Sequence, residues 1–112
     1  PITDFIDQCL PKHQVKILRL LSLLEEKGPT LPRPYSDILY DGIHELRFTL
    51  SQAKVRVLYF FCYQKFIVLH YVFFKNTQKV PDKFIKKVIE YRSDFLKKAS
   101  QKKLEDNWRA IF

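Results

Sequence analysis

Two arginines in neighbouring apolar segments are the residues of this sequence best placed to bind an anion. Arg47 and Arg56 each lie in the middle of an alternating segment, and Ser51 and Gln52 lie between the two segments. If Ser51 and Gln52 form a two-residue turn, counting outward along both segments places Arg47 directly opposite Arg56. Facing guanidinium groups repel unless an anion or a carboxylate lies between them. Because arginine presents a planar fork to phosphate oxygens, the pair is a candidate phosphate clamp.

Glu45 supports a second interpretation of the same arginines. It precedes Arg47 by two residues, so it points to the same face of an extended segment. A carboxylate near both guanidinium groups would neutralise them at a sheet edge and make the pair a structural ion-pair network. The residue pattern leaves both interpretations open.

A basic stretch follows the third apolar segment. Lys75 and Lys79 flank Thr77 and precede Pro81-Asp82, where we expect a helix to begin. Backbone N–H groups and the helix dipole favour an anion at such a place, and Thr77 adds a hydroxyl donor. An ordinary basic loop is the alternative. The anion-binding interpretation depends on this loop leaving a strand next to the arginine pair.

Aromatic residues are interleaved with these charges and are candidates for stacking on the bases of single-stranded RNA. Tyr71 and Tyr91 are the candidates, and Lys83 is a further candidate RNA contact. Packing in the core is the more frequent role of such aromatic residues. For Tyr59 and Phe73 we expect core packing.

The remaining reactive side chains form no recognisable catalytic or metal-binding pattern. His13, His44 and His70 lack the spacing of metal ligands, and we expect structural roles for them. Cys9 and Cys62 have no metal or redox spacing and fit buried thiols in a reducing cytosol. The sequence also lacks a glycine-rich phosphate loop and the HExxH and GxSxG motifs. We therefore expect neither a metal nor a cofactor.

Length and charge set the broad class of the protein. The chain has 112 residues, 46% of them hydrophobic, and a formal net charge of +8. This is enough to bury the core of one domain. The charge favours encounter with polyanions, although a merely solvated cationic surface explains it as well. We expect a cytoplasmic protein without a signal peptide or a membrane span, because no apolar run approaches about 18 residues.

The elements that must position these residues follow from hydrophobic periodicity. A helix over 3–9, with Thr3 as its N-cap, precedes an amphipathic helix over 13–27 that Gly28-Pro29 ends. We expect three antiparallel strands, and we expect the second and third to be covered on both faces. The strands cover residues 43–50, 54–62 and 66–74, and a last helix begins near 81–82. The sequence therefore predicts an α+β fold, with a helical hairpin packed on a small antiparallel sheet of three or more strands and a C-terminal helix.

Two further segments lie outside these elements. The proline-containing connection 29–42 is predicted to be extended or turn-like, with Leu31, Tyr35, Ile38 and Leu39 packing against the core. The tail 99–112 is predicted to extend the last helix or to form a separate turn. Three alternatives stay open for Trp108 in this tail: a contact within a homodimer, a contact with a protein partner, or no function.

The order of these blocks resembles the RelE/HigB-type toxin superfamily, and more narrowly the branch of small phage-derived HigB-like proteins. The resemblance is carried by the segments DGIHELRF, VRVLYFF, IVLHYVFFKNTQKVP and EYRSDFLKK and covers about residues 3–98. It is specific in the ELR and KNTQKVP blocks. The sequence departs from the family pattern at Asn76, which is commonly basic, and at His44, which is commonly aromatic.

This resemblance implies the toxin of a type II toxin–antitoxin system that enters the ribosomal A site and cleaves mRNA. A small helix-turn-helix antitoxin would neutralise it. Carried over by position, Arg47 and Arg56 would hold the scissile phosphate, and Lys75 or Lys79 would stabilise charge or protonate the leaving group. The general base is left unassigned. A non-catalytic RNA- or protein-binding module of the same fold, or a gyrase-poisoning ParE-like toxin, is the alternative.

Overall fold

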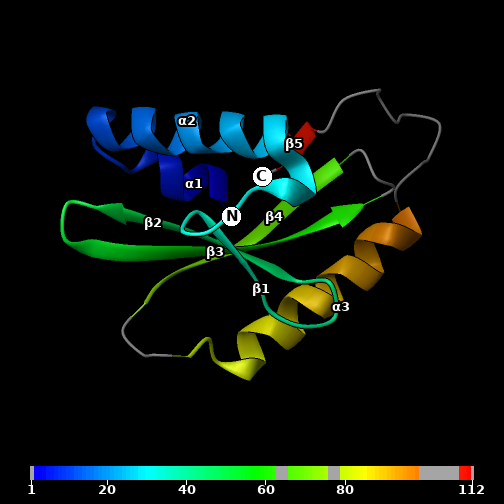
Figure 1. Ribbon diagram of the computed structural model, residues 1–112. Helices are drawn as coiled ribbons and strands as arrows, with labels where there is room; N and C mark the ends of the chain where they lie inside the picture. The colour runs from blue at the N-terminus through cyan, green and yellow to red at the C-terminus, as the bar shows by residue number, and fades with distance from the viewer. Residues whose placement is uncertain (1, 63–65, 76–78, 99–108, 112) are drawn as a thin grey trace.

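A β-sheet separates two helical layers, with α1 and α2 on one face and α3 on the other (Figure 1). The computed structural model describes residues 2–62, 66–75, 79–98 and 109–111 of the chain. In these ranges the helices are α1 (Ile2–Asp7), α2 (Pro11–Lys27), the 3-10 helix η1 (Gly28–Thr30) and α3 (Asp82–Lys98). The strands are β1 (Ser36–Ile38), β2 (His44–Leu50), β3 (Ala53–Cys62), β4 (Phe66–Phe74) and β5 (Arg109–Ile111). The predicted α+β fold, with a helical hairpin before the sheet and a helix after it, is confirmed.

The described strands lie in the order β1-β2-β3-β4-β5. Pairing is antiparallel from β1 to β4, whereas β5 is parallel to β4. The three predicted strands are β2, β3 and β4. The connection contains β1, which agrees with its predicted extended geometry, whereas the prediction for the tail was wrong because the tail contains β5. Both segments are short and carry little periodicity, and each is a strand because it pairs with an outer strand of the central three, β1 with β2 and β5 with β4.

The helical hairpin begins earlier than its sequence signals suggest. Helix α1 starts at Ile2, so Thr3 lies inside the helix and the prediction that it is the N-cap was wrong. Pro11 is the first residue of α2, a position that needs no backbone N–H group. Gly28 ends α2 as predicted, with a φ of 55° and its N–H bonded to the carbonyl oxygen of Leu24. Such a positive φ favours glycine.

Strand β3 contributes to a hydrophobic core on each face of the sheet. Val55, Val57 and Tyr59 pack in the core beneath α1 and α2. Leu58 and Phe60 pack on the opposite face with residues of α3. The prediction that this strand is covered on both faces is confirmed. Tyr59, predicted to be a core residue, is 1% exposed, and its hydroxyl shares a 2.7 Å hydrogen bond with Ser36 that ties β1 to β3.

Replacing Leu24 by alanine should destabilise the whole fold. Leu24 is fully buried in α2, and truncating a buried leucine costs about 2–5 kcal/mol through lost transfer energy and the cavity left behind. Urea unfolding followed by circular dichroism measures the change. Leu18→Ala is the matched control on the same helix, because Leu18 is 49% exposed. Equal losses in the two variants would contradict this packing.

The stability of the protein should fall as the pH drops below about 6.5. Burial lowers the pKa values of His44, which stacks on Tyr59, and of His70. Unfolded histidines bind protons near pH 6.5, before the folded ones do, so their contribution is present above that pH and is lost as the pH falls toward the folded pKa. Urea unfolding between pH 7 and about pH 5 measures the slope. The double variant His44→Gln/His70→Gln should show a smaller slope, and an unchanged slope would refute the prediction.

Candidate functional site

The two arginines face each other across the β2–β3 hairpin. Leu50 pairs with Ala53 around a two-residue turn, and this register makes Arg47 and Arg56 direct cross-strand partners. Ser51, the first turn residue, has a φ of 56°. The predicted juxtaposition of Arg47 and Arg56 is confirmed.

Glu45 lies next to both guanidinium groups. Its Oε1 atom is 3.1 Å from Nε of Arg47 and 3.8 Å from Nε of Arg56. Glu45 is only 2% exposed, so its charge is held away from water. The interpretation in which this carboxylate neutralises the pair is therefore supported by the structure. One carboxylate against two guanidinium groups still leaves a net charge of +1 on the three residues together.

The two arginines differ in how they can meet a ligand. The Arg47 side chain is 29% exposed, whereas that of Arg56 is 9% exposed and donates from Nη1 to the carbonyl oxygen of Val55 at 3.0 Å. Burial lowers the pKa of Arg56, Glu45 counteracts this change, and Arg47 adds to it. Within the described residues, Oε2 of Glu45 and Nε of Arg56 are buried without a hydrogen-bond partner. The positive charge of the arginine pair is therefore only partly compensated, and Arg47 is the more accessible of the two arginines.

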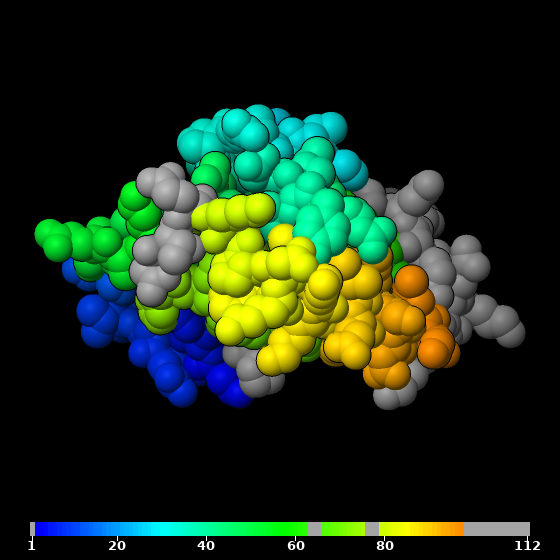
Figure 2. Space-filling model, turned by 90° about the horizontal axis from the view of Figure 1, so that it is seen from below, coloured from blue at the N-terminus to red at the C-terminus, as the bar shows by residue number. Residues whose placement is uncertain are grey.

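Two lysines extend the positive charge on the same face of the sheet. The backbone N–H of Lys75 donates to the carbonyl oxygen of Lys54 at 2.8 Å, so the two residues pair just beyond the end of β4. Strand alternation puts both on the face that carries Arg56. Helix α3, yellow to orange in Figure 2, covers the middle of this face, and the green β2–β3 hairpin extends past it. The residues that share this end of the face are Arg47, Lys54, Arg56 and Lys75.

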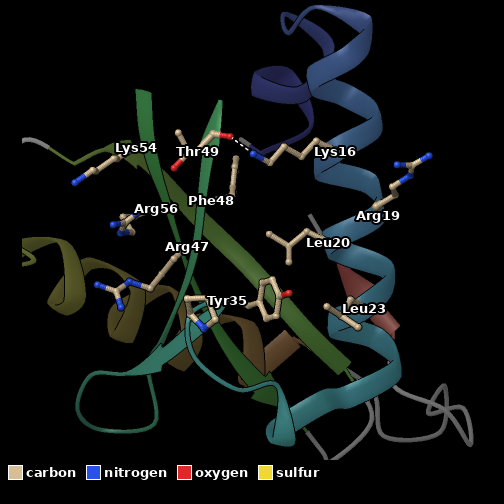
Figure 3. A pocket seen from close by; sticks show the side chains of 11 residues that line it. Lys16, Arg19, Leu20, Leu23, Tyr35, Arg47, Phe48, Thr49, Lys54 and Arg56 are labelled. Atoms are coloured by element: carbon tan, nitrogen blue, oxygen red, sulfur yellow. Dashed lines mark hydrogen bonds between the residues drawn. The ribbon is translucent and has the colours of Figure 1, made fainter. Parts of the chain in front are cut away.

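A groove of about 540 Å³ runs beside the arginine pair, between α2 and the edge of β2 (Figure 3). It is lined by Lys16, Arg19, Leu20, Leu23, Pro34, Tyr35, Arg47, Phe48, Thr49, Lys54 and Arg56. The ammonium group of Lys16 donates a hydrogen bond to the carbonyl oxygen of Thr49 across the groove. The sequence analysis did not identify the groove residues of α2, because a lysine on an amphipathic helix is usually part of its solvated face. Lys54 was detectable, since it lies two residues before Arg56 on the same strand.

The structure agrees with only part of the prediction for the connection 29–42. Leu31 is buried and Leu39 packs against the α3-side core, as predicted. Tyr35 and Ile38 were expected in the core but are 42% and 68% exposed. Strand β1 covers only the first half of β2, so Tyr35, just before β1, stays at the sheet edge and lines the groove.

The other predicted residues in and just after the basic stretch lie in different settings. Lys79 is exposed and contributes to the lowered pKa of Asp82, which is set mainly by the hydroxyl of Tyr40. Lys83 lies over the ring of Phe84, 5.7 Å from its centroid. Thr77 falls outside the described residues. A role for these residues in RNA binding or catalysis stays a prediction.

Tyr71 and Tyr91 belong to the layer between β4 and α3. Tyr71 packs against Phe84 with Lys87 over its ring, and Tyr91 stacks on His70 with a centroid distance of 3.6 Å. His70 lies at the irregularity where the β3–β4 register shifts. Each tyrosine already makes ring contacts within the protein. Their role as RNA contacts stays a prediction.

Two features are absent from the part of the chain that the structure describes. No group of three or more histidine, cysteine, aspartate or glutamate side chains there is arranged to hold a metal ion. None of the helices in that part of the chain is long and apolar enough to cross a membrane.

The sequence of this chain matches the model of one known protein family. The sequence model of the family described as Phage derived protein Gp49-like (DUF891) matches residues 4–93. Neither a search of curated proteins nor a search of solved structures gave a significant match. The matched residues include the arginine pair, Glu45 and Lys75. The Gp49-like family is associated with the toxins of toxin–antitoxin systems. The chain belongs to this family of phage-derived Gp49-like proteins.

Proposed function

We propose that the protein is the toxin of a type II toxin–antitoxin system and that it cleaves mRNA on the ribosome. The observation that carries the proposal is the cross-strand pair of Arg47 and Arg56, held by one buried carboxylate at the lip of a cation-lined groove. Membership of a toxin-associated family and the resemblance to RelE/HigB-type toxins support it. A helix-turn-helix antitoxin is the expected protein partner.

The proposed reaction transfers a phosphoryl group within the RNA. The ribose 2′-oxygen attacks the adjacent 3′-phosphorus, the bond from phosphorus to the 5′-oxygen of the next nucleotide breaks, and a 2′,3′-cyclic phosphate forms. The 2′-hydroxyl loses its proton to a base, and the leaving 5′-oxygen gains one. Negative charge grows on the phosphoryl oxygens in the transition state, where positioned cations stabilise it. Arg47 and Arg56 supply that stabilisation, and Lys75 or Lys79 assists the leaving group.

A second candidate function is a non-catalytic binding module of the same fold. The observation that favours it is the burial of Arg56 against Glu45, which limits direct contact between Arg56 and a phosphate. Such a module would arrest growth through RNA or protein binding and leave mRNA intact. A gyrase-poisoning toxin would instead produce DNA damage signalling.

Replacing Arg47 by lysine should reduce cleavage at least tenfold while leaving the protein folded. Lysine keeps the positive charge beside Glu45 but cannot reproduce the planar fork of guanidinium donors. Arg47→Ala should reduce cleavage further, by about 100-fold or more, the usual cost of losing one transition-state donor. The measurement is translation in a cell-free extract with mapped mRNA 5′ ends. Lys97→Ala, which removes one exposed cation near the end of α3, is the control and should cleave normally.

Expression of the protein in cells, with mRNA 5′ ends mapped in the same culture, separates the candidate functions. Growth arrest with uncut mRNA would favour the binding module, and DNA damage signalling would favour a gyrase poison. Normal cleavage by the folded Arg47→Ala variant would refute the proposed clamp. Arg56→Lys is the more informative change at Arg56, because Arg56→Ala would leave the buried carboxylate with a single partner and so combine a folding defect with a catalytic one.

Glu45→Gln should lower both stability and cleavage. Glutamine keeps the shape of the side chain but removes the charge that separates Arg47 from Arg56, and breaking a buried ion pair costs about 3–5 kcal/mol. Urea unfolding measures the stability. Glu26→Gln is the matched control, because Glu26 is an exposed residue of α2. Equal unfolding free energies for the two variants would show that Glu45 does not hold the arginines together.

A further inference from the structure

The groove is lined by cations other than the arginine pair. Lys16, Arg19, Arg47, Lys54 and Arg56 line it, and none of the described residues in its lining is acidic. In Figure 3, Lys54 and Arg56 lie on the far side of the two strands from α2, whereas Lys16 extends from α2 toward β2. The guanidinium group of Arg19 points away from the strands in this view. Lys16 and the pair of Lys54 and Arg56 therefore lie on opposite sides of the two strands.

Lys16 is fixed at a definite place on this path. Its ammonium group donates to the carbonyl oxygen of Thr49, two residues along β2 from Arg47. Two residues of strand span about 6.8 Å. An ammonium group has three donors, so two remain for an oxygen of a ligand. A chain with repeated negative charges can contact Arg47 and then Lys16 as it crosses the strand edge.

The wall of the groove between these cations is apolar and partly aromatic. Leu20 and Leu23 extend from α2 toward the ring of Tyr35 (Figure 3). Tyr35 is 42% exposed, and it packs in neither hydrophobic core. A planar base can stack on such a ring regardless of its identity, as bases do in single-stranded nucleic acid sites.

The hydrogen bonds at the edge of β2 argue against a peptide strand in the same place. A peptide that extends the sheet needs free backbone N–H and C=O groups along the edge. The N–H of Arg47 already donates to the carbonyl oxygen of Tyr35 at 2.8 Å. The carbonyl oxygen of Thr49 already accepts from Lys16. The groove presents side-chain cations and an aromatic ring to an incoming chain, a combination that suits single-stranded RNA.

We propose that this groove binds the RNA strand next to the cleaved phosphate, with one flanking phosphate on Lys16, another on Lys54 and a base stacked on Tyr35. The inference rests on the proposed function in one respect, since it places the cleaved phosphate at Arg47. It extends the RNA-binding surface from the sheet to helix α2. Arg47 and Arg56 act on the reacting phosphate, whereas Lys16 and Tyr35 hold the flanking nucleotide.

The test is the binding of a fluorescently labelled 2′-O-methyl hexanucleotide, which has no free 2′-hydroxyl to react. Fluorescence anisotropy at several salt concentrations gives the dissociation constant and its salt dependence. Lys16→Ala and Lys54→Ala should each reduce the slope of log K against log salt by about 0.7, the value for one lost phosphate contact on a single strand. Tyr35→Ala should weaken binding about tenfold with an unchanged slope, and Tyr35→Phe should restore it.

Lys12→Ala is the matched control, because Lys12 is an exposed lysine of α2 outside the groove. Slopes for Lys16→Ala and Lys54→Ala equal to that of Lys12→Ala would overturn the inference. Equal binding by a glutamate hexapeptide, lost in Tyr35→Ala, would also overturn it and identify an acidic-peptide site. Lys54→Ala keeps the test valid if Lys16→Ala, which loses the bond to Thr49, fails to fold.

The outcome for the groove is separable from the outcome for cleavage. RNA binding that depends on Lys54 and Tyr35 in a protein that never cuts mRNA would support the groove and refute the nuclease. Normal cleavage on the ribosome by a Tyr35→Ala variant with unchanged hexanucleotide binding would refute the groove alone.

Discussion

The ion-pair network of Glu45, Arg47 and Arg56 is the interaction on which the functional end of this molecule depends. The β2–β3 register sets two like charges directly opposite each other, an arrangement that destabilises a strand pair. A buried carboxylate within ion-pair distance of both arginines offsets that repulsion and orients the guanidinium groups. Because it carries one charge against two, it leaves one positive charge of the three residues uncompensated. The proposed phosphate contact would meet this charge, so the structural role and the proposed anion-binding role of the pair use the same arrangement.

The layering of the fold keeps this network at the surface. Strand β3 is buried between two helical layers over most of its length, which anchors Arg56 in a rigid part of the sheet. Helix α3 covers the middle of its face, and the β2–β3 hairpin extends past it (Figure 2). Arg47 and Lys54 belong to this hairpin. On the other side of β2, the short β1 leaves room for the groove against α2. Charge is therefore concentrated where neither helical layer closes over the sheet.

Local patterns predicted the parts of the fold that local interactions stabilise. The three central strands, the glycine end of α2 and the turn at Ser51 all follow from periodicity and backbone preference, and turn length alone fixed the arginine register. The predictions for Thr3, Tyr35, Ile38 and the tail were wrong for one shared reason. Each depended on which neighbour the segment would meet: Tyr35 is an aromatic residue that could pack in the core, yet it lies just before β1 and its ring stays at the sheet edge.

The sequence by itself determined the helix–sheet–helix order, the facing arginines and the candidate role of Glu45, because strand alternation and a two-residue turn are properties of neighbours in the chain. Only the tertiary structure decided that Glu45 is buried beside both arginines and that Arg47 is more accessible than Arg56. It also decided that Lys16 and Tyr35 share a groove with them. Burial and convergence depend on how α2 packs over the sheet, and residues 16, 35 and 47 carry no local signal of that packing.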